Sequence, residues 1–135
     1  MIIADTDVLI DYLAGRRPAA EAVSRALLQD QLQTTTLNGF ELLAGVRGNK
    51  QRESVLALLR SIPVLPLDFD AARRAAEVHQ QLERSGIKIG MGDSLIAGIV
   101  LARGGTLLTR NVRHFERVPG LSLAELQPAT RNFPP

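Results

Sequence analysis

The stretch MIIADTDVLIDYL, residues 1–13, begins the chain with a strand pattern that passes directly into a helix pattern. Its first residues are a short apolar run that ends in an acid at Asp5, as expected of a short strand. Apolar residues then recur at helical spacing until the run stops at Gly15. A strand followed at once by a helix is typical of α/β folds, so this stretch indicates an α/β protein.

The same alternation of strands and helices continues to residue 115. After the first strand and helix we expect strands at 33–36, 64–67 and 105–109, helices at 19–31, 37–46, 51–61, 70–84 and 93–103, and a short helical turn at 112–115. Asp70 is expected to cap the helix 70–84, and Pro66 favours an edge position for the strand 64–67. The pattern predicts an α/β three-layer sandwich with a mostly parallel sheet of four to five strands and helices on both faces.

The composition fits one domain. With 135 residues, of which 45% are hydrophobic, the chain can bury one sizeable core. We expect a single domain at 1–125 and a proline-rich C-terminal tail at 126–135. The sequence has no apolar run near the roughly 20 residues that cross a bilayer, and its N-terminus carries acid where a signal peptide carries positive charge. These features predict a cytoplasmic protein that does not associate with a membrane.

Charge is distributed unevenly along the chain. Residues 1–70 hold 7 Lys and Arg against 9 Asp and Glu, whereas residues 71–135 hold 9 against 5. A basic half beside an acidic half suits a protein that handles phosphodiesters, although a GC-rich genome also favours arginine. Since the chain has no cysteine and only two histidines, any metal would be held by oxygen, which favours Mg²⁺ or Mn²⁺.

Four oxygen-bearing side chains are expected at one edge of the sheet. Asp5 closes the first strand and Asn111 follows the last predicted one, while Glu41 and Asp93 lie in the first turns of two helices. Ligands of parallel α/β sheets bind beyond the carboxyl ends of the strands, and right-handed crossovers place the helix starts at the same edge. Converging acids raise one another's pKa unless a cation lies among them, so the arrangement predicts a Mg²⁺ site.

Each of these residues also has a simpler interpretation. Asp93 follows two glycines and opens an apolar helix, so it can act as a helix cap and nothing more. Asp7 and Asp11 are compatible with a solvated face of the first helix, and Asn111 with a turn. The position of the acids relative to one another decides between these interpretations.

Four segments together resemble a known family. They are DTDVLIDYL at 5–13, FELLAGV at 40–46, GDSLIAGIV at 92–100 and LLTRNVRHF at 107–115. Each is weak alone, but in this order and spacing they resemble the PIN-domain ribonucleases, and specifically the VapC-type toxins of prokaryotic toxin–antitoxin pairs. The resemblance implies a Mg²⁺- or Mn²⁺-dependent endoribonuclease that forms a homodimer. It also implies a VapB-type antitoxin that blocks the site, and an RNA substrate such as tRNA or rRNA.

The resemblance also assigns roles to individual residues. The catalytic and metal-binding acids would be Asp5, Glu41 and Asp93. Chemistry and position in the chain add further candidates. The Thr6 hydroxyl and the Thr109 and Asn111 side chains can hydrogen-bond these acids or water. Lys88, which precedes Asp93, and Arg110 and Arg113, which follow the last strand, are candidates to contact RNA phosphates, although each is also compatible with ordinary solvated surface.

Further expectations concern the reaction. Asn111 stands where many relatives have a fourth acid, so we expect one tightly bound ion. In-line attack by an activated water would leave a 5′-phosphate and a 3′-hydroxyl. The segment VRHF predicts a turn in which the His114 ring packs or caps, so a catalytic histidine is not expected.

Two other classes of protein remain open at this point. The segments DTDVL and GDSLIA are near matches to haloacid dehalogenase-type phosphohydrolases, but Leu9 and Ala97 depart from the motifs of that family. A phosphorylation receiver domain fits the length but lacks its expected acid and lysine. The second class is a catalytically weak PIN-type module that binds RNA or antitoxin, and cleavage of RNA by the purified protein separates it from an enzyme.

Two expectations concern assembly. Apolar residues in 37–65 exceed what one small sheet can cover, so part of the helices 37–47 and 51–61 is expected to form a subunit interface. The tail of the antitoxin is expected to lie over the cleft near the three acids, with apolar anchors in the adjacent groove.

Overall fold

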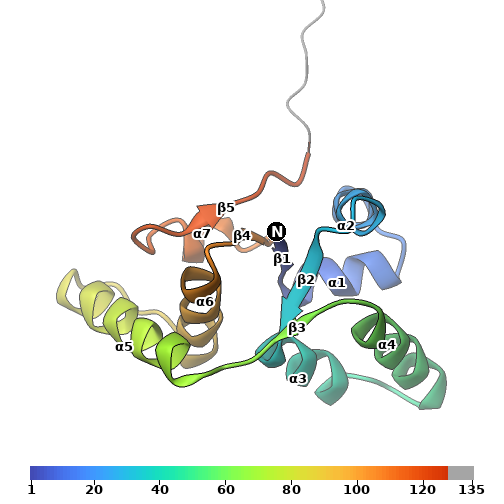
Figure 1. Cartoon of the computed structure of the whole chain (residues 1–135), viewed down its shortest axis with the longest axis horizontal. Coiled ribbons are helices and arrows are strands. Elements are labelled where there is room, and N and C mark those ends of the chain that lie inside the picture. Colours follow the sequence, from blue (N-terminus) through green and yellow to red (C-terminus); the bar gives the residue numbers. More distant parts are fainter. Residues whose placement is uncertain (128–135) are drawn as a thin grey trace, which may run out of the picture.

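The computed structural model describes residues 1–127 and shows helices packed around a central sheet (Figure 1). The strands of the described residues are β1 (Ile2–Ala4), β2 (Leu32–Thr35), β3 (Val64–Leu65), β4 (Thr106–Leu108) and β5 (Ser122–Leu123). The helices of the same residues are α1 (Thr6–Leu13), α2 (Ala19–Leu28), α3 (Thr36–Ala44), α4 (Asn49–Ser61), α5 (Phe69–Arg84), α6 (Met91–Arg103) and α7 (Val112–Phe115).

The sheet has the order β3-β2-β1-β4-β5, and every pair of neighbouring strands is parallel. The predicted α/β fold with a parallel sheet is therefore confirmed. β3 lies at one edge and ends just before Pro66, as expected of a strand beside a residue that cannot donate to a ladder. β1 lies in the centre, so its carboxyl end is flanked by those of β2 and β4. We call the side of the sheet where the carboxyl ends of β1, β2 and β4 lie together the rim.

Alternate residues of the central strands point to opposite faces and enter two separate cores. Ile3 and Leu107 pack with apolar residues of α5, α6 and α7, whereas Ala4 and Leu108 pack with those of α1, α2 and α4. Figure 1 shows these two groups of helices on opposite sides of the strands. The three-layer arrangement is what leaves the rim as an open edge between the two helical layers.

α6 lies unusually close to α5, because Gly98 gives the two helices room to approach. A Cβ on Gly98 would lie 2.8 Å from the backbone nitrogen of Ala75 and would also clash with the Ala71 carbonyl oxygen. The backbone of α5 cannot move aside as a flexible side chain would. This close contact fixes the position of α6, which carries Asp93 at its start.

The helices and strands differ from the sequence-based expectations in several details, among them β3, which ends at Leu65 rather than at residue 67. α5 is capped by Asp68, whose carboxylate accepts a hydrogen bond from the Ala71 amide at 2.9 Å, so the assignment of Asp70 as the cap was wrong. Asp70 lies in the first turn of the helix and pairs with Arg73 and Arg74. β5 was not predicted, because two paired residues leave too short a pattern. α2 ends at Leu28 rather than at residue 31.

Most of the predicted proline-rich tail, 126–135, lies outside the described residues. In the part of the chain that the structure describes, the helices are too short or too polar to cross a membrane.

Candidate active site

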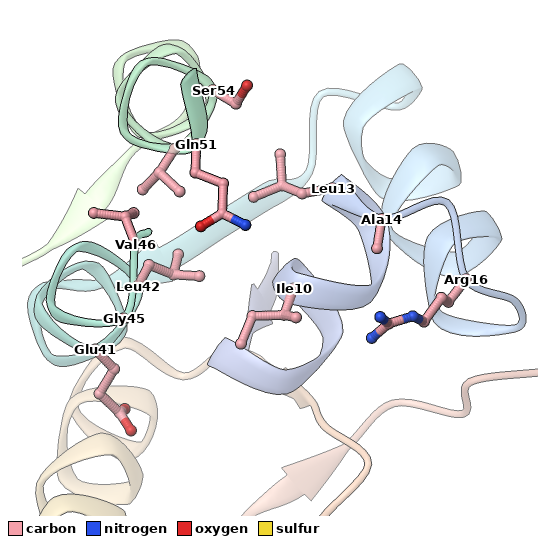
Figure 2. Close-up of a pocket in the computed structure, with 11 residues that line it drawn as sticks. Ile10, Leu13, Ala14, Arg16, Glu41, Leu42, Gly45, Val46, Gln51 and Ser54 are labelled. Carbon is pink, nitrogen blue, oxygen red and sulfur yellow. The ribbon is translucent and has the colours of Figure 1, made fainter. Parts of the chain in front are cut away.

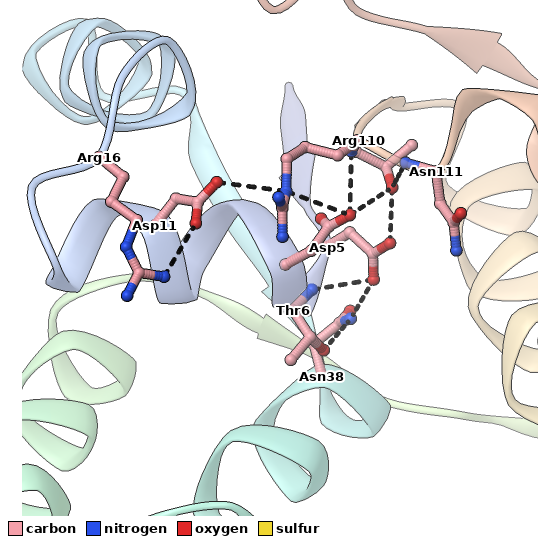
Figure 3. A network of polar contacts seen from close by, with 9 residues as sticks. Asp5, Thr6, Asp11, Arg16, Asn38, Arg110 and Asn111 are labelled. Atoms are coloured by element: carbon pink, nitrogen blue, oxygen red, sulfur yellow. Dashed lines mark hydrogen bonds and ion pairs between the residues drawn. The ribbon is translucent and has the colours of Figure 1, made fainter.

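Asp5 is the central side chain of the rim. It follows β1 directly, caps α1, and is only 7% exposed. Its Oδ1 accepts hydrogen bonds from the Thr6 amide at 2.8 Å and from Asn38 Nδ2 at 2.9 Å. Its Oδ2 accepts one from the Thr109 hydroxyl at 2.7 Å, and Figure 3 shows this network from close by. Three donors from α1, α3 and the end of β4 therefore fix the orientation of the carboxylate.

The surroundings of Asp5 disfavour its ionised form. Burial raises the pKa of Asp5 from 3.8 to about 6, and the charges of Asp7 and Asp93 act in the same direction. The hydrogen bonds from Thr109 and Thr6 lower the pKa, but they do not offset the loss of water. A carboxylate held this way, with other acids near it, gains from a cation that neutralises the repulsion.

Glu41 is connected to Asp5 through two polar side chains. The Thr6 hydroxyl donates to Glu41 Oε1 at 3.1 Å, and Asn38 Nδ2 donates to the Thr6 hydroxyl at 3.0 Å as well as to Asp5. Asn38 is fully buried, and its Oδ1 accepts from the Thr35 hydroxyl at 2.6 Å. The structure thus brings Glu41, Thr6 and Asp5 together as the sequence predicts.

The contribution of Thr35 and Asn38 was missed by the sequence analysis. Thr35 is the N-cap of α3, and its hydroxyl accepts from the Asn38 amide at 3.2 Å. A threonine followed three residues later by a polar residue, at the end of a strand, is a recognisable capping signal. Asn38 also precedes Glu41 by three residues, which places both on one face of the helix. These two signals could have identified the pair.

Asp93 lies in the first turn of α6 but does not occupy the cap position, which belongs to Gly90. Its Oδ2 lies 3.5 Å from His114 Nδ1, and its charge contributes to the raised pKa of Asp5. The His114 side chain is 62% exposed, so the expectation that its ring packs or caps was wrong. The structure therefore brings Asp93 and α7 to the same rim as Asp5.

In their present positions, the acidic side chains of the rim do not form a complete metal site. Within residues 1–127, no three His, Asp or Glu side chains are arranged so that they could hold a metal ion together without adjustment. The available donors at the rim are carboxylate, hydroxyl and amide oxygens, which is the donor chemistry that Mg²⁺ and Mn²⁺ prefer. The donor types and the raised pKa of Asp5 fit a hydrated divalent cation that keeps several of its waters.

The segment after β4 contributes to the rim mainly through Thr109. The backbone amide of Asn111, and not its side chain, donates to the Thr109 hydroxyl at 3.0 Å, and the backbone amide of Arg110 donates to Asp7 Oδ2 at 3.0 Å. The Arg110 guanidinium Nε lies 3.2 Å from Asp11 Oδ2. Asp11 is buried rather than on a solvated face, so the simpler interpretation of Asp11 was wrong.

The two other predicted phosphate contacts have exposed positions beside the rim. Lys88 lies in the segment that leads into α6, and Arg113 lies on α7. Their positions leave both cations accessible from solvent.

A groove opens beside Glu41, between α1, α3 and α4. It has a volume of about 350 Å³ and is lined by apolar side chains, among them Ile10, Leu13, Leu42 and Val46. Glu41 and Arg16 are the charged residues of its lining. Figure 2 shows these side chains around the groove, with Glu41 at the side that faces α6. We call it the α1/α3/α4 groove.

Comparison with known proteins assigns the chain to a family, and the parallel sheet and the acidic rim fit this assignment. Residues 2–121 match the PIN domain family over most of the chain. The chain therefore belongs to the PIN domain family. This membership excludes the haloacid dehalogenase-type alternative.

The relatives narrow the class further. The chain is 37% identical over 115 residues to ribonuclease VapC10 of Mycobacterium tuberculosis, a match that covers 85% of this chain and 86% of that protein. It is 31% identical over 121 residues to the tRNA(fMet)-specific endonuclease VapC of Shigella flexneri, with 87% and 91% covered. The fold matches VapBC2 of Rickettsia felis bound to a promoter DNA fragment with a TM-score of 0.79 at 23% identity, over 92% and 98% of the chains. Within the PIN domain family, the protein is thus a VapC-type ribonuclease toxin of a VapBC toxin–antitoxin system.

Proposed function

We propose that this ribonuclease is a Mg²⁺-dependent endonuclease, with Mn²⁺ as an alternative ion, and that Asp5, Glu41 and Asp93 hold the ion. The observation that carries the proposal is the buried Asp5 carboxylate, whose pKa is raised to about 6 beside Asp7 and Asp93. A buried acid with such a raised pKa is typical of functional sites, where a positively charged partner stabilises the ionised form. A divalent ion is that partner, and the oxygen donors at the rim suit it.

A bound divalent ion would neutralise charge on the scissile phosphate and lower the pKa of a water. Asp5 and Asp93 would contact the ion directly, and Glu41, which already accepts from Thr6, would bind it through a water or orient the attacking water. Thr109, Thr6 and Asn38 keep the Asp5 carboxylate in one orientation. In-line attack of the water on the phosphorus would break the bond to the 3′ oxygen, which would take up a proton, and would leave a 5′-phosphate and a 3′-hydroxyl.

The substrate class follows from charge and from the relatives. Lys88 and Arg113 are exposed cations beside the rim and would contact RNA phosphates. Asn111 adds no charge, so one tightly held ion is proposed rather than two. The name of the Shigella flexneri relative specifies tRNA(fMet), which makes tRNA the first substrate to test and rRNA the second. Since tRNA and rRNA are cytoplasmic molecules, we propose that the protein acts in the cytoplasm.

The experiment is cleavage of end-labelled RNA by the purified protein across a titration of Mg²⁺ and Mn²⁺. We expect cleavage that is lost in EDTA and restored by either ion. The downstream fragment should carry a 5′-phosphate, which ligation to an RNA with a free 3′-hydroxyl detects. Cleavage that persists in EDTA, or a product with a 2′,3′-cyclic phosphate, would contradict the mechanism. Absence of cleavage with intact metal binding would instead favour the module that binds RNA or antitoxin without turnover.

We also propose a VapB-type antitoxin whose tail occupies the α1/α3/α4 groove and reaches the rim at Glu41. The groove offers apolar contacts from Ile10, Leu13 and Val46, and an arginine of the tail could pair with Glu41. Ile10 and Leu13 are 45% and 38% exposed, so they are apolar surface without cover in the described chain.

Leu13→Glu is expected to weaken antitoxin binding by about tenfold or more, because a charge would replace an apolar anchor in the groove. Calorimetric titration with the antitoxin measures the affinity. Leu28→Glu is the matched control, since Leu28 is 87% exposed on α2 and lies outside the groove. Equal affinities for the two variants would place the tail elsewhere, and a tail bound to the opposite face of the sheet in a complex structure would exclude the proposal.

We further propose a homodimer. The apolar residues Leu42, Val55 and Leu58 of α3 and α4, which led to this expectation, are buried within one chain. Phe40 of α3, at 69% exposure, is the residue that remains available for a subunit interface. Light scattering that gives a monomer mass at micromolar concentration would contradict the dimer.

A further inference from the structure

Asp11 is a buried acid that the reaction does not use directly. It lies on α1, is 5% exposed, and forms ion pairs with two arginines. Its Oδ2 lies 3.2 Å from Arg110 Nε, and its Oδ1 lies 3.7 Å from Arg16 Nη1, as drawn in Figure 3. A buried carboxylate without a partner of opposite charge would strongly destabilise the fold, so Asp11 needs these ion pairs. Arg110 is the closer of the two partners.

Asp7 binds the same segment one turn earlier on α1. Asp7 and Asp11 are four residues apart and therefore project from one face of the helix. Asp7 Oδ2 accepts a hydrogen bond from the Arg110 amide at 3.0 Å and lies 3.5 Å from the Thr109 hydroxyl. α1 thus holds residues 109–111 at two points: Asp7 binds the backbone and lies 3.9 Å from Arg110 Nε, and Asp11 pairs with the guanidinium at the shorter distance of 3.2 Å. We call this segment the 109–111 loop.

The 109–111 loop carries the donor that orients the central acid. Thr109 donates to Asp5 Oδ2 at 2.7 Å, and its oxygen also accepts from the Asn111 amide at 3.0 Å. Thr109 itself is 1% exposed, so its hydroxyl has little room to move independently of the loop. A shift of the loop away from α1 would lengthen the contact between Thr109 and Asp5.

We infer that Arg110 is a positioning residue: its ion pair with Asp11 holds the 109–111 loop so that Thr109 fixes the Asp5 carboxylate. The inference rests on the proposed role of Asp5 in holding the ion. It differs from the role expected from the sequence, in which Arg110 contacts RNA phosphate. An Arg110 guanidinium turned toward RNA would leave Asp11 with Arg16 alone, at the longer distance of 3.7 Å.

The test compares Arg110→Ala, Asp11→Asn and the double variant in the full-length protein. At saturating RNA and Mg²⁺, kcat should fall on the order of 10- to 100-fold in each single variant, as for other residues that orient metal ligands. KM for RNA should change by less than about threefold, because no substrate contact is removed. The double variant should be no slower than the worse single variant, since both substitutions break the same ion pair.

A second readout does not depend on turnover. Calorimetric titration with Mn²⁺ alone should show a dissociation constant raised on the order of tenfold in both single variants. Arg110→Lys should recover part of this affinity, because an ammonium can still pair with Asp11. The matched control is the exposed ion pair of α5, in which Arg73 Nη2 lies 2.7 Å from Asp70 Oδ1. Neither residue belongs to the segments that form the rim, and the control variants are Arg73→Ala and Asp70→Asn. These control variants should bind Mn²⁺ as the parent protein does.

Phosphate binding by Arg110 gives a different pattern. Arg110→Ala would then raise KM with unchanged Mn²⁺ affinity, and Asp11→Asn would leave KM unchanged or lower it by releasing the guanidinium. A KM raised by more than about threefold in Arg110→Ala with unchanged Mn²⁺ affinity, or a KM lowered by a similar factor in Asp11→Asn, would overturn the inference. Arg110→Ala leaves the buried Asp11 carboxylate with Arg16 alone, so near-ultraviolet circular dichroism checks that each single variant folds. The double variant leaves no buried carboxylate at position 11, and it keeps the test available if a single variant does not fold.

Asp5→Asn separates this inference from the proposed function. If Asp5→Asn cleaves RNA and binds Mn²⁺ normally, the proposed metal site is wrong and the positioning role falls with it. If Asp5→Asn is inactive while Asp11→Asn and Arg110→Ala keep full kcat and Mn²⁺ affinity, only the positioning role is wrong.

Discussion

Asp93→Asn is expected to abolish Mg²⁺-dependent RNA cleavage while the melting temperature of the metal-free protein stays unchanged. Removal of the charge should cost more than the roughly 10- to 100-fold that loss of an outer-shell partner costs. Stability should hold because Gly90, not Asp93, occupies the cap position of α6, so the substitution removes no capping hydrogen bond and only the favourable charge at the helix start, which contributes about 0.3–1 kcal/mol. Cleavage assays at limiting Mg²⁺ and thermal unfolding in EDTA measure the two effects.

Asp70→Asn provides the matched control for this variant. Asp70 also lies in the first turn of a long helix, α5, and carries the same carboxylate in an exposed position away from the rim. Its replacement should leave cleavage unchanged. If Asp93→Asn retains near-full activity at limiting Mg²⁺, as Asp70→Asn should, then Asp93 is only an acid at a helix start and the proposed site is wrong.

The contact between Asp93 and His114 adds a second expectation to the same experiment. His114 Nδ1 lies 3.5 Å from Asp93 Oδ2, and most of the ring is exposed. The lost contact should therefore contribute little to the stability of Asp93→Asn, because exposed pairs of this kind contribute about 1 kcal/mol or less. A large drop in melting temperature would mean that the pair is structural and that the activity loss has a trivial cause.

The placement of Asp5 and Glu41 near each other could be predicted from the sequence. The prediction needed only that Asp5 ends a strand, that Glu41 lies one turn into the helix after a neighbouring strand, and that parallel strands end at a common edge. These are properties of topology, and topology follows from the alternation of short apolar runs with amphipathic segments. The central position of β1 then brings both residues to the rim.

The side chains that orient these acids could not be predicted in the same way. Asp11 looked like one of several acids on an exposed helix, yet it is buried because Arg110, 99 positions later in the chain, lies against it. Asn38 is buried because its amide reaches both Asp5 and Thr6. Such partners depend on how α1, α3 and the segment after β4 pack together, which periodicity does not encode.

Local signals were also less decisive than topology. Asp68 and Asp70 both precede an apolar helical run, and only the geometry of the chain decides which carboxylate faces the free amides. β5 consists of Ser122 and Leu123, and it exists because β4 offers an unpaired edge rather than because its residues favour a strand.

Asp5→Asn is expected to abolish metal-dependent cleavage and, unlike most substitutions of a buried residue, to stabilise the metal-free protein. The pKa of Asp5 is raised to about 6 from 3.8, mainly by burial, so an ionised Asp5 destabilises the fold at neutral pH. A pKa difference of this size corresponds to roughly 3 kcal/mol, of which asparagine would recover a part. The melting temperature in EDTA at pH 7.5 should therefore rise.

The hydrogen bonds around position 5 can accommodate the amide. The carbonyl oxygen of the introduced asparagine, in place of Oδ1, would still accept from the Thr6 amide and from Asn38. Its NH₂ group would face the Thr109 hydroxyl, which can accept this bond and turn its own proton toward Asp7 Oδ2, 3.5 Å away. The replacement therefore keeps every hydrogen bond of the present network, and only the second N–H of the introduced amide has no partner in it.

The stability gained by Asp5→Asn should depend on pH. Between about pH 6 and pH 4 the folded parent protein binds a proton at Asp5, whereas the unfolded chain, with the ordinary pKa of 3.8, does not. This group therefore stabilises the metal-free parent protein as the pH falls through that window, and the contribution is absent in Asp5→Asn. The stability difference between variant and parent should be largest above pH 6 and should shrink toward pH 4. A variant that is less stable than the parent protein at pH 7.5, by an amount that does not change with pH, would show that the ionised carboxylate is a stabilising part of the metal-free fold. The rim would then need no cation to offset the charge of Asp5.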